Sequence, residues 1–357
     1  MSPAAAPLAA LRLSALGIAG ADAATPVEAV RRLLAIQAQD FAGALWSLGL
    51  RVPGSTAASI EAAHTGGEIV RSWPMRGTLH LVAAEDLGWM LSLTGQRMVR
   101  AAEGRRRQLG LEAADFVRAE TLIRAELSGG RAATRAALMS ALDAGGHVTS
   151  GQRGVHTLGQ LAQTGVLVQS GKDSWSLLDE WVTSPRRLEP EEALREFALR
   201  YALGHGPVTA RDFAWWSSLT LTDARRGLAA AADQLEELTS GDETYFLRPG
   251  LEPAPRGVHL LPGFDEFVLG YTDRAPQLPK EHFMTIVPGG NGIFLPTIVV
   301  DGQVVGTWKR AKATKKLTTF TLVPFTGTLS STTRRALQAR LERYGEFLAT
   351  EVGFAAG

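Results

Sequence analysis

One arrangement of segments occurs three times along the chain and limits how it can fold: helices followed by a short pair of strands. The first copy begins with a helix predicted over 25–38, where Thr25 and Glu28 form a capping box. A second helical stretch near 55–65 precedes residues 69–82, which alternate as two strands joined by a short turn. Helices closed by such a hairpin are typical of a winged helix.

The second and third copies show the same order. In the second, the predicted segments are two helices over 118–143, the second of which Thr134 can cap, a third helix over 149–165 and a hairpin over 166–178. In the third, they are helices over 191–203, 210–219 and 220–235 and a hairpin over 236–248 with a Gly241-Asp242 turn. The copies share a pattern without a strict sequence repeat.

The chain changes character near residue 256 and becomes rich in strands, with an Asp301-Gly302 hairpin turn and a final helix over 331–350. We therefore predict an α+β fold made of three tandem winged-helix units and a β-rich C-terminal part. The predicted boundaries are 1–104 (unit 1), 105–188 (unit 2), 189–255 (unit 3) and 256–357 (the C-terminal part, with a hairpin at 297–310).

Composition excludes several classes of protein. The 357 residues are 45% apolar and 20% charged, as in folded proteins, and contain no cysteine. The absence of cysteine excludes disulfides, thiolate metal sites and a cysteine nucleophile, and it suits a reducing cytoplasm. The first residues lack a basic segment and Arg12 interrupts their apolar stretch, so we expect no secretory signal. No apolar run reaches the roughly 18 residues of a membrane helix, and we expect a cytoplasmic protein.

Charge is balanced overall but unevenly distributed. The net charge is 37 − 36 = +1, yet residues 97–107 hold five arginines and residues 308–316 hold five cations without an acid. Segregated charge of this kind can present a basic surface to phosphates. It can equally belong to two solvated faces, and charge alone leaves both interpretations open.

The familiar motifs of enzymes and cofactor sites are absent from the sequence. The seven histidines are scattered without a metal-binding spacing, and no Gly-Gly pair is followed by the Lys-Ser/Thr of a phosphate loop. No G-x-S-x-G nucleophile motif occurs either. We therefore expect no metal and no cofactor.

Two glutamines, Gln37 and Gln39, lie at the predicted end of the first helix. Residues two apart point to nearly opposite sides of a helix but to the same side of an extended chain. If both act on one ligand, the helix must end there and the chain must straighten or turn. Asp40 and Gly43 make an ending at 39–40 plausible. The residues alone also allow an ordinary solvated helix end.

A set of strings spread along the chain resembles the AlkZ-type winged-helix DNA glycosylases. In order, the strings are QAQD, LWSLGLR, RSWPMRGTLHLVAAED, AWWSSLTLTDAR, LLPGFDEFVLGYTDR and VVDGQVVGTWKR, from about residue 10 to about residue 325. The resemblance implies a C-shaped clamp on duplex DNA. It also implies excision of guanine alkylated at N7, including bulky adducts and interstrand crosslinks, and self-resistance to DNA-alkylating natural products such as azinomycin.

The resemblance implies a catalytic motif of two polar residues around an apolar one, which Gln37-Ala38-Gln39 matches. A glutamine amide is not basic, so it cannot act as a general base. N7-alkylguanine already carries a positive charge and leaves readily, so two amides need only place a water and direct their dipoles at the oxocarbenium-like sugar. No lysine is near the motif in sequence, which favours a monofunctional enzyme. Asp40 is an alternative base, although it should point away from Gln39.

Eight residues are candidate contacts to double-stranded DNA with alkylated guanine, the predicted partner. They are Arg76, His80, Arg153, Arg211, Trp308, Lys309, Arg310 and Lys312. The last four belong to the hairpin at 297–310 and its exit, which we interpret as a probe of the DNA groove; Trp308 in the core is the alternative. We expect a monomer, since no dimer helix is evident. Two alternatives remain: a non-catalytic winged-helix regulator and an interaction scaffold.

Overall fold

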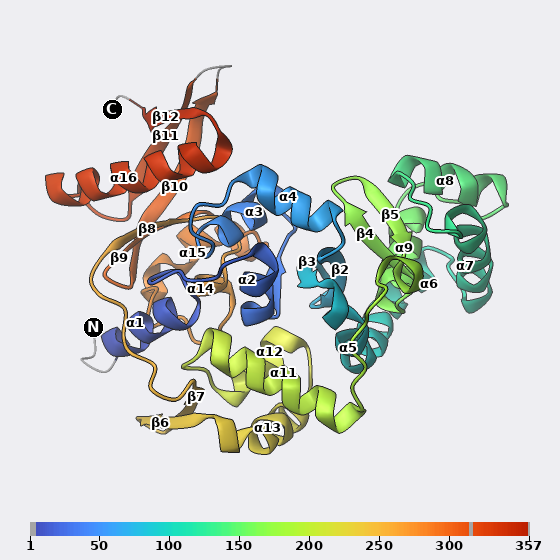
Figure 1. The fold of residues 1–357 in the computed structure, drawn as a ribbon, viewed down its shortest axis with the longest axis horizontal. Coiled ribbons are helices and arrows are strands. Elements are labelled where there is room, and N and C mark those ends of the chain that lie inside the picture. The colour runs from blue at the N-terminus through green and yellow to red at the C-terminus, as the bar shows by residue number, and fades with distance from the viewer. Residues whose placement is uncertain (1–4, 314–316, 356–357) are drawn as a thin grey trace.

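The structure, a computed structural model, describes residues 5–313 and 317–355. It has the predicted α+β class, with three winged-helix units followed by a β-rich C-terminal part. Figure 1 shows unit 2 at the right, unit 3 at the bottom and the C-terminal sheet with its long helix at the upper left, around unit 1. None of the described helices is long and apolar enough to cross a membrane.

Unit 1 contains most of the residues that matter for the candidate site. Its elements are α1 (Ala5–Ala15), α2 (Pro26–Leu33), β1 (Ala35–Gln37), α3 (Phe41–Gly49), α4 (Ala57–Thr65), β2 (Ile69–Met75), β3 (Thr78–Ala83) and α5 (Leu87–Ala101). Half of the predicted capping box of α2 is present: Glu28 N donates to Thr25 Oγ1 at 3.3 Å. The Glu28 carboxylate accepts from Ala24 N at 2.8 Å instead of from Thr25 N.

The helix predicted over 25–38 is too long. α2 ends at Leu33, Leu34 has a φ of 63°, and the chain continues as strand β1. β1 pairs antiparallel with β3, and Ala38 N donates to Leu79 O at 2.7 Å. The apolar residues of this segment suit a helix or a buried strand equally well, so pairing with a distant strand decides between them.

Units 2 and 3 follow the predicted order of elements. Unit 2 contains α6 (Glu103–Gln108), α7 (Ala113–Leu127), α8 (Arg135–Ala144), α9 (Arg153–Gln163), β4 (Leu167–Gly171), β5 (Ser174–Leu177) and α10 (Leu178–Trp181). Unit 3 contains α11 (Pro190–His205), α12 (Ala210–Ser217), α13 (Leu221–Ala230), β6 (Glu236–Ser240) and β7 (Glu243–Leu247). The predicted hairpin turn at Gly241-Asp242 joins β6 to β7.

The wings of units 1 and 2 are not separate. They form one five-stranded sheet in the order β1-β3-β2-β4-β5, in which Arg71 of β2 pairs with Gln169 of β4. The wing of unit 3 remains a two-stranded sheet of β6 and β7. The shared sheet therefore connects the strand that carries Gln37 with unit 2.

The C-terminal part is built around a second five-stranded sheet in the order β12-β11-β10-β9-β8. Its elements are β8 (Val258–Leu261), α14 (Glu266–Leu269), α15 (Phe283–Ile286), β9 (Thr297–Val300), β10 (Gln303–Ala313), β11 (Leu317–Pro324), α16 (Ser331–Leu348) and β12 (Glu351–Phe354). The predicted final helix corresponds to α16.

The hairpin predicted over 297–310 exists as β9 and β10, but its turn is not a free tip. Gly302 is buried, and a Cβ atom at this glycine would lie 3.3 Å from the Cβ of Ala9 in α1. Asp301 N donates to Gly257 O at 2.8 Å, which holds the turn to the preceding loop. This turn therefore cannot probe a DNA groove. The connection between β10 and β11 falls at 314–316, outside the described residues.

The hydrophobic core does not follow the predicted boundaries. One cluster runs through units 1 and 3 and the C-terminal part, and it also includes Val168 and Val182 of unit 2. Trp46 of α3 shows this, because its ring lies 4.7 Å from that of Tyr344 and 5.1 Å from that of Phe347, and its Nε1 donates to Leu260 O at 3.0 Å. Unit 2 has a cluster of its own, which includes Ile123, Leu127, Leu138, Leu142, Leu158, Leu161 and Trp175.

Candidate catalytic site around Gln37 and Gln39

Gln37 is the last residue of β1 and is only 5% exposed. It lies opposite His80 of β3, and Arg76 Nη2 donates to its Oε1 at 3.2 Å. A guanidinium group can only donate, so this contact fixes the orientation of the amide with its oxygen toward Arg76. The amide nitrogen has no hydrogen-bond partner among the described residues.

Gln39 follows the strand and is exposed. Its Oε1 accepts a hydrogen bond from Leu79 N at 3.2 Å. Both glutamine oxygens therefore face the β2–β3 hairpin, and each retains one free lone pair. Within the described part of the chain the amide nitrogen of Gln39 also lacks a partner, so both glutamines can donate to a ligand.

Arg76 lies in the turn between β2 and β3 and connects Gln37 to unit 3. Its Nη1 donates to Trp216 O at 2.9 Å, and its backbone N–H donates to Ser218 Oγ at 2.9 Å. The guanidinium carbon lies 5.4 Å from the ring centre of Trp215, within cation–π range. Burial lowers the pKa of Arg76. The predicted contact of Arg76 with DNA is not what the structure shows, because its guanidinium points into the protein.

His80 is fully buried beneath this arginine. Its Nδ1–H donates to Thr78 O at 2.9 Å, and its Nε2 accepts from Arg76 Nη2 at 2.9 Å. Burial and the positive charge of Arg76 hold the pKa of His80 well below 6.5, so the ring is neutral. The prediction that His80 contacts phosphate or deoxyribose is wrong for this structure, since no part of its side chain reaches the surface.

The neutral state of His80 predicts a pH dependence of stability. The folded protein holds the pKa below that of the unfolded chain, so between these two values only the unfolded chain binds the proton, and stability falls as pH drops below about 6.5. Below about pH 6.5, the wild type should lose up to about 1.4 kcal/mol of folding stability per pH unit because of His80, and His80→Gln should not show this loss. Urea denaturation of both proteins at pH 7, 6 and 5 measures it. An identical pH dependence would contradict the prediction.

Arg71 holds the alanine between the two glutamines. Its Nε and Nη2 donate to Ala38 O at 3.1 and 2.6 Å, and its Nη1 donates to Gln169 Oε1 at 2.9 Å. The guanidinium thus joins the motif to β4 of unit 2. Reading the sequence missed this residue, although its place in the alternating strand marked it as a side chain on one face of the sheet.

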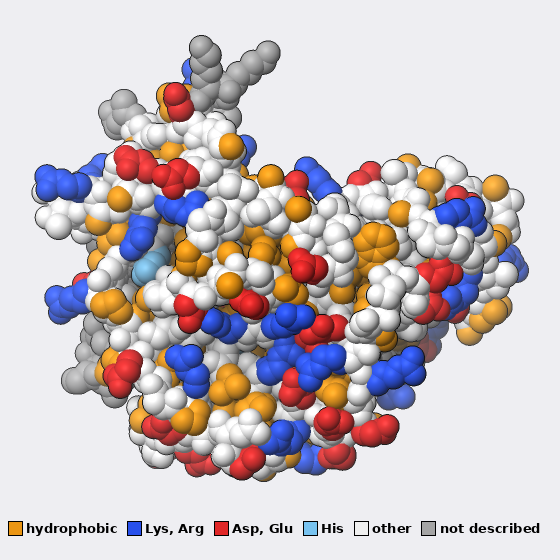
Figure 2. Space-filling view, viewed as in Figure 1, with side chains coloured by type: hydrophobic (Ala, Val, Ile, Leu, Met, Phe, Trp, Pro, Cys, Tyr) orange, Lys and Arg blue, Asp and Glu red, His pale blue; other side chains and the backbone are white. Residues whose placement is uncertain are grey.

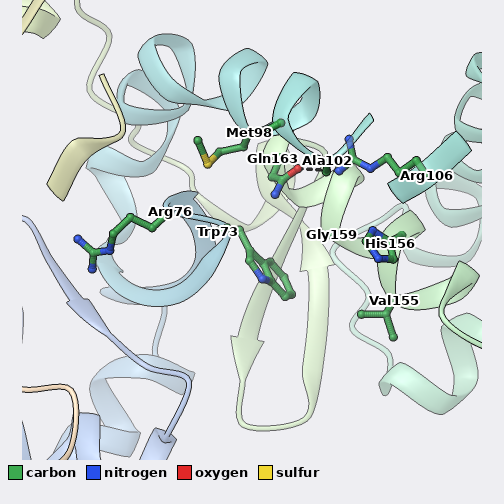
Figure 3. A pocket seen from close by; sticks show the side chains of 11 residues that line it. Trp73, Arg76, Met98, Ala102, Arg106, Val155, His156, Gly159 and Gln163 are labelled. Carbon is green, nitrogen blue, oxygen red and sulfur yellow. Dashed lines mark hydrogen bonds between the residues drawn. The ribbon is translucent and has the colours of Figure 1, made fainter. Parts of the chain in front are cut away.

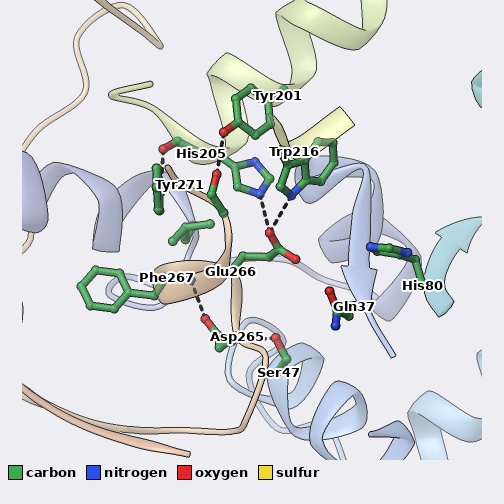
Figure 4. Close-up of polar contacts among 12 residues, drawn as sticks. Gln37, Ser47, His80, Tyr201, His205, Trp216, Asp265, Glu266, Phe267 and Tyr271 are labelled. Carbon is green, nitrogen blue, oxygen red and sulfur yellow. Dashed lines mark hydrogen bonds and ion pairs between the residues drawn. The ribbon is translucent and has the colours of Figure 1, made fainter. Parts of the chain in front are cut away.

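Glu266 is a buried carboxylate at the start of α14, and sequence analysis did not single it out. Its Oε2 accepts from Trp216 Nε1 at 2.8 Å and lies 3.3 Å from His205 Nε2. Its Oε1 is buried and has no partner among the described residues. Figure 4 shows the carboxylate between Trp216 and Gln37. The same tryptophan also supplies the carbonyl that binds Arg76.

Two cavities flank Trp73 at the junction of units 1 and 2. One, of about 520 Å³, is lined by Gln39, Arg71, Leu79, Gln169 and Lys172, among others. The other, of about 470 Å³, lies beside α5 and α9 and includes Arg76, Met98, Arg106 and His156 in its wall (Figure 3). Trp73 stacks on Trp175 of β5 at 5.8 Å. Gln39 therefore opens onto a hollow that could admit part of a large ligand.

The remaining predicted DNA contacts differ in their surroundings. Trp308 is 4% exposed and donates to Leu261 O at 2.8 Å, so it is a core residue and the prediction of a DNA contact is wrong. Arg153 turns inward and donates to the carbonyls of Gly110 and Val148, which argues against a phosphate contact. Arg211 is exposed but paired with Glu243.

The basic clusters are only partly at the surface. Lys309, Arg310 and Lys312 are exposed on β10. In the arginine cluster, Arg106 is buried, donates to Gln163 Oε1 at 2.8 Å, and has a pKa lowered by burial to about 10. Figure 2 shows cationic and anionic side chains mixed over the face in view. Among the described residues no group of histidine and acidic side chains could hold a metal ion.

Comparison with known proteins defines the class. The model of the family described as DNA glycosylase AlkZ-like matches residues 30–347. The chain therefore belongs to the AlkZ-like DNA glycosylase family.

A sequence match and a structural match, both from Streptomyces sahachiroi, show how close the similarity is. The chain is 28% identical over 312 residues to an interstrand DNA cross-link repair glycosylase, covering 79% of this chain and 81% of that protein. The solved structure of the DNA glycosylase AlkZ matches with a TM-score of 0.80 and 22% identity, over 98% of this chain and 99% of that one. The structural match shows that the two chains share a fold.

Proposed function

We propose that the protein is a DNA glycosylase that hydrolyses the N-glycosidic bond of cationic N7-alkylguanine, with Gln37 and Gln39 as its catalytic residues. Its substrates include bulky adducts and interstrand crosslinks, and its role is repair or self-resistance against DNA-alkylating natural products. The observation that carries the proposal is that Gln37, at the end of β1, and Gln39, in the bend that follows, both turn their amide oxygens toward the β2–β3 hairpin. Arg76 and Leu79 N hold these oxygens, and neither amide nitrogen has a hydrogen-bond partner in the part of the chain that the structure describes.

The chemistry requires little acid or base. Water adds to C1′, the bond from C1′ to N9 breaks, and the bonding electrons neutralise the positive base as it leaves. The water releases its proton to solvent. The second lone pair of a glutamine oxygen can accept from this water, and the fixed amide dipoles can stabilise the sugar as it becomes positive. The proposal restricts the enzyme to cationic, labile lesions.

A crosslinked base cannot rotate out of the duplex, because it is bonded to the opposite strand, so ordinary base flipping is unavailable. We propose that the protein clamps the duplex as a monomer and reaches C1′ through the minor groove. The exposed cations of β10 and Arg211 remain the proposed phosphate contacts.

The cations of β10 give a direct test of this DNA contact. Replacing Lys309 and Lys312 by alanine should weaken binding to undamaged duplex and reduce the slope of log K against log [salt] by about 1 for each lysine. Fluorescence anisotropy over a series of salt concentrations measures both quantities. An exposed arginine of α16, Arg335, provides the matched control, for which we expect no change in slope. Equal slopes in wild type and both lysine variants would exclude these contacts.

The absence of a lyase step is also part of the proposal. Lys172, distant in sequence, lines the same cavity as Gln39, so the sequence argument against a nearby lysine does not hold. Lys172 is nevertheless exposed at the β4–β5 turn beside Asp173, whereas a Schiff-base lysine is normally desolvated. Borohydride should therefore trap no covalent complex with abasic DNA. A trapped adduct that disappears in Lys172→Ala would show a lyase.

The decisive experiment measures release of free base from duplex DNA containing N7-methylguanine or an N7-linked crosslink. A glycosylase releases the modified base and leaves an abasic site. A non-catalytic winged-helix regulator, the alternative, would bind the same duplexes with a steep salt dependence and release nothing.

A further inference from the structure

The proposed reaction places an electrostatic demand on the site. The lesion is a cation, and the sugar becomes positive in the transition state, yet the group that holds Gln37 is the guanidinium of Arg76. A positive charge behind the catalytic amide opposes further positive charge in front of it, and the effect is large where water is excluded. The site therefore needs a negative charge close to Arg76.

Glu266 meets this need from a distant part of the chain. It is fully buried, and both it and Arg76 bind Trp216, one through the indole N–H and the other through the carbonyl. Glu266 opposes the effect of burial on Arg76 by stabilising the charged guanidinium. Its Oε1, which has no hydrogen-bond partner in the ranges 5–313 and 317–355, lies on the side of the carboxylate that faces Gln37 in Figure 4.

Other charges around Arg76 do not replace this carboxylate. Arg274 lies over the ring of Trp215, as Arg76 does, with its guanidinium carbon 5.2 Å from the ring centre. It therefore adds a second positive charge. Asp212 stabilises the charged form of Arg274, whose pKa burial lowers to about 10. Asp212 binds the N–H and hydroxyl of Thr272 at 2.8 and 2.6 Å. Glu266 is the acid whose charge acts on Arg76.

We propose that Glu266 is a positioning residue that neutralises Arg76, so that the catalytic amide of Gln37 is presented without a net positive charge behind it. This inference rests on the proposed glycosylase function. The Gln-Ala-Gln motif contains no carboxylate. Glu266, which lies 229 positions after Gln37 in the chain, supplies one. Glu266 need not touch DNA, since it acts through Arg76.

The test compares single-turnover base release from N7-methylguanine duplex by Glu266→Gln, Arg76→Gln and the double variant. Glutamine keeps an oxygen that can accept from Trp216, so Glu266→Gln removes mainly the charge. We expect its rate to fall by about 100-fold with unchanged affinity for undamaged duplex. Arg76→Gln should lose about 10-fold. The double variant should release base as fast as Arg76→Gln and faster than Glu266→Gln.

The reversal in the double variant separates charge from structure. If Glu266 serves only to hold Trp216 and His205, then removing Arg76 cannot restore the rate and the two losses will add. Additive losses, or an unchanged rate in Glu266→Gln, would overturn the inference. Asp265→Asn, which changes the neighbouring buried carboxylate, is the control: it should lower thermal stability but keep the rate of the folded protein within about threefold. Wild-type protein that releases no base would instead refute the proposed function.

Discussion

Replacing Gln37 by alanine should lower the single-turnover rate of base release by about 10²- to 10³-fold, the usual cost of losing one preorganised polar group at a developing charge. Its amide is the more constrained of the two, because it is 5% exposed and bonded to Arg76. Binding to undamaged duplex should remain within about twofold, since a buried amide contributes little to phosphate contacts. Quantifying released N7-methylguanine by chromatography measures the rate.

Gln39→Ala tests the second half of the motif. We expect it also to lose base release, because this amide faces the cavity at the junction of units 1 and 2. Gln338→Ala is the matched control: Gln338 lies on α16, and its amide nitrogen donates to Glu342 of the same helix. If both motif variants release base at the wild-type rate, Gln37 and Gln39 are structural and another group performs the chemistry.

Replacing Arg51 by methionine should lower the free energy of unfolding by about 3–5 kcal/mol, because it leaves the buried carboxylate of Asp265 without its partner. Both side chains are 1% exposed, and they are joined by two contacts, Nη1 to Oδ2 at 2.9 Å and Nη2 to Oδ1 at 3.1 Å. Arg51 follows α3, whereas Asp265 precedes α14. The pair thus joins unit 1 to the C-terminal part.

Chemical denaturation of Arg51→Met, followed by circular dichroism, measures this loss. The exposed pair of Arg107 and Glu103 gives the comparison, since its members are 74% and 68% exposed and Arg107→Ala should cost less than about 1 kcal/mol. The double variant Arg51→Met/Asp265→Leu should recover much of the loss, since it removes the unpaired charge. Equal losses in the buried and exposed pairs would contradict the interpretation.

The fold could be predicted where local signals are strong. Thr25 and Thr134 cap their helices through side-chain oxygens, and the Gly241-Asp242 turn closes its hairpin. β1 was missed because nothing in Ala35–Gln37 distinguishes a strand from the last turn of a helix. The burial of the Asp301-Gly302 turn was missed for a related reason, because it depends on contact with α1, nearly 300 residues earlier.

The candidate site was predictable only in part. Gln37 and Gln39 were identified through resemblance to a family, since a pair of glutamines has no chemical signature of its own. Arg76 and His80 were chosen correctly as residues near the site but assigned to DNA, because a sequence cannot show that a guanidinium turns inward. Glu266 could not be found at all, since its partners Trp216 and His205 are 50 and 61 positions away.

The division of the core determines which parts of this protein can be exchanged during evolution. Unit 2 has a hydrophobic cluster of its own, so α7 and α8, which pack on each other and on the rest of unit 2, can be exchanged or lengthened with little repacking of the other units. The other three parts share one cluster and must vary together. α9 and β4 are more constrained, because α9 packs on α5 and β2 and β4 belongs to the shared sheet, where Gln169 holds Arg71 against Ala38. A recombined unit 2 must keep these contacts if the Gln-Ala-Gln motif is to stay in place.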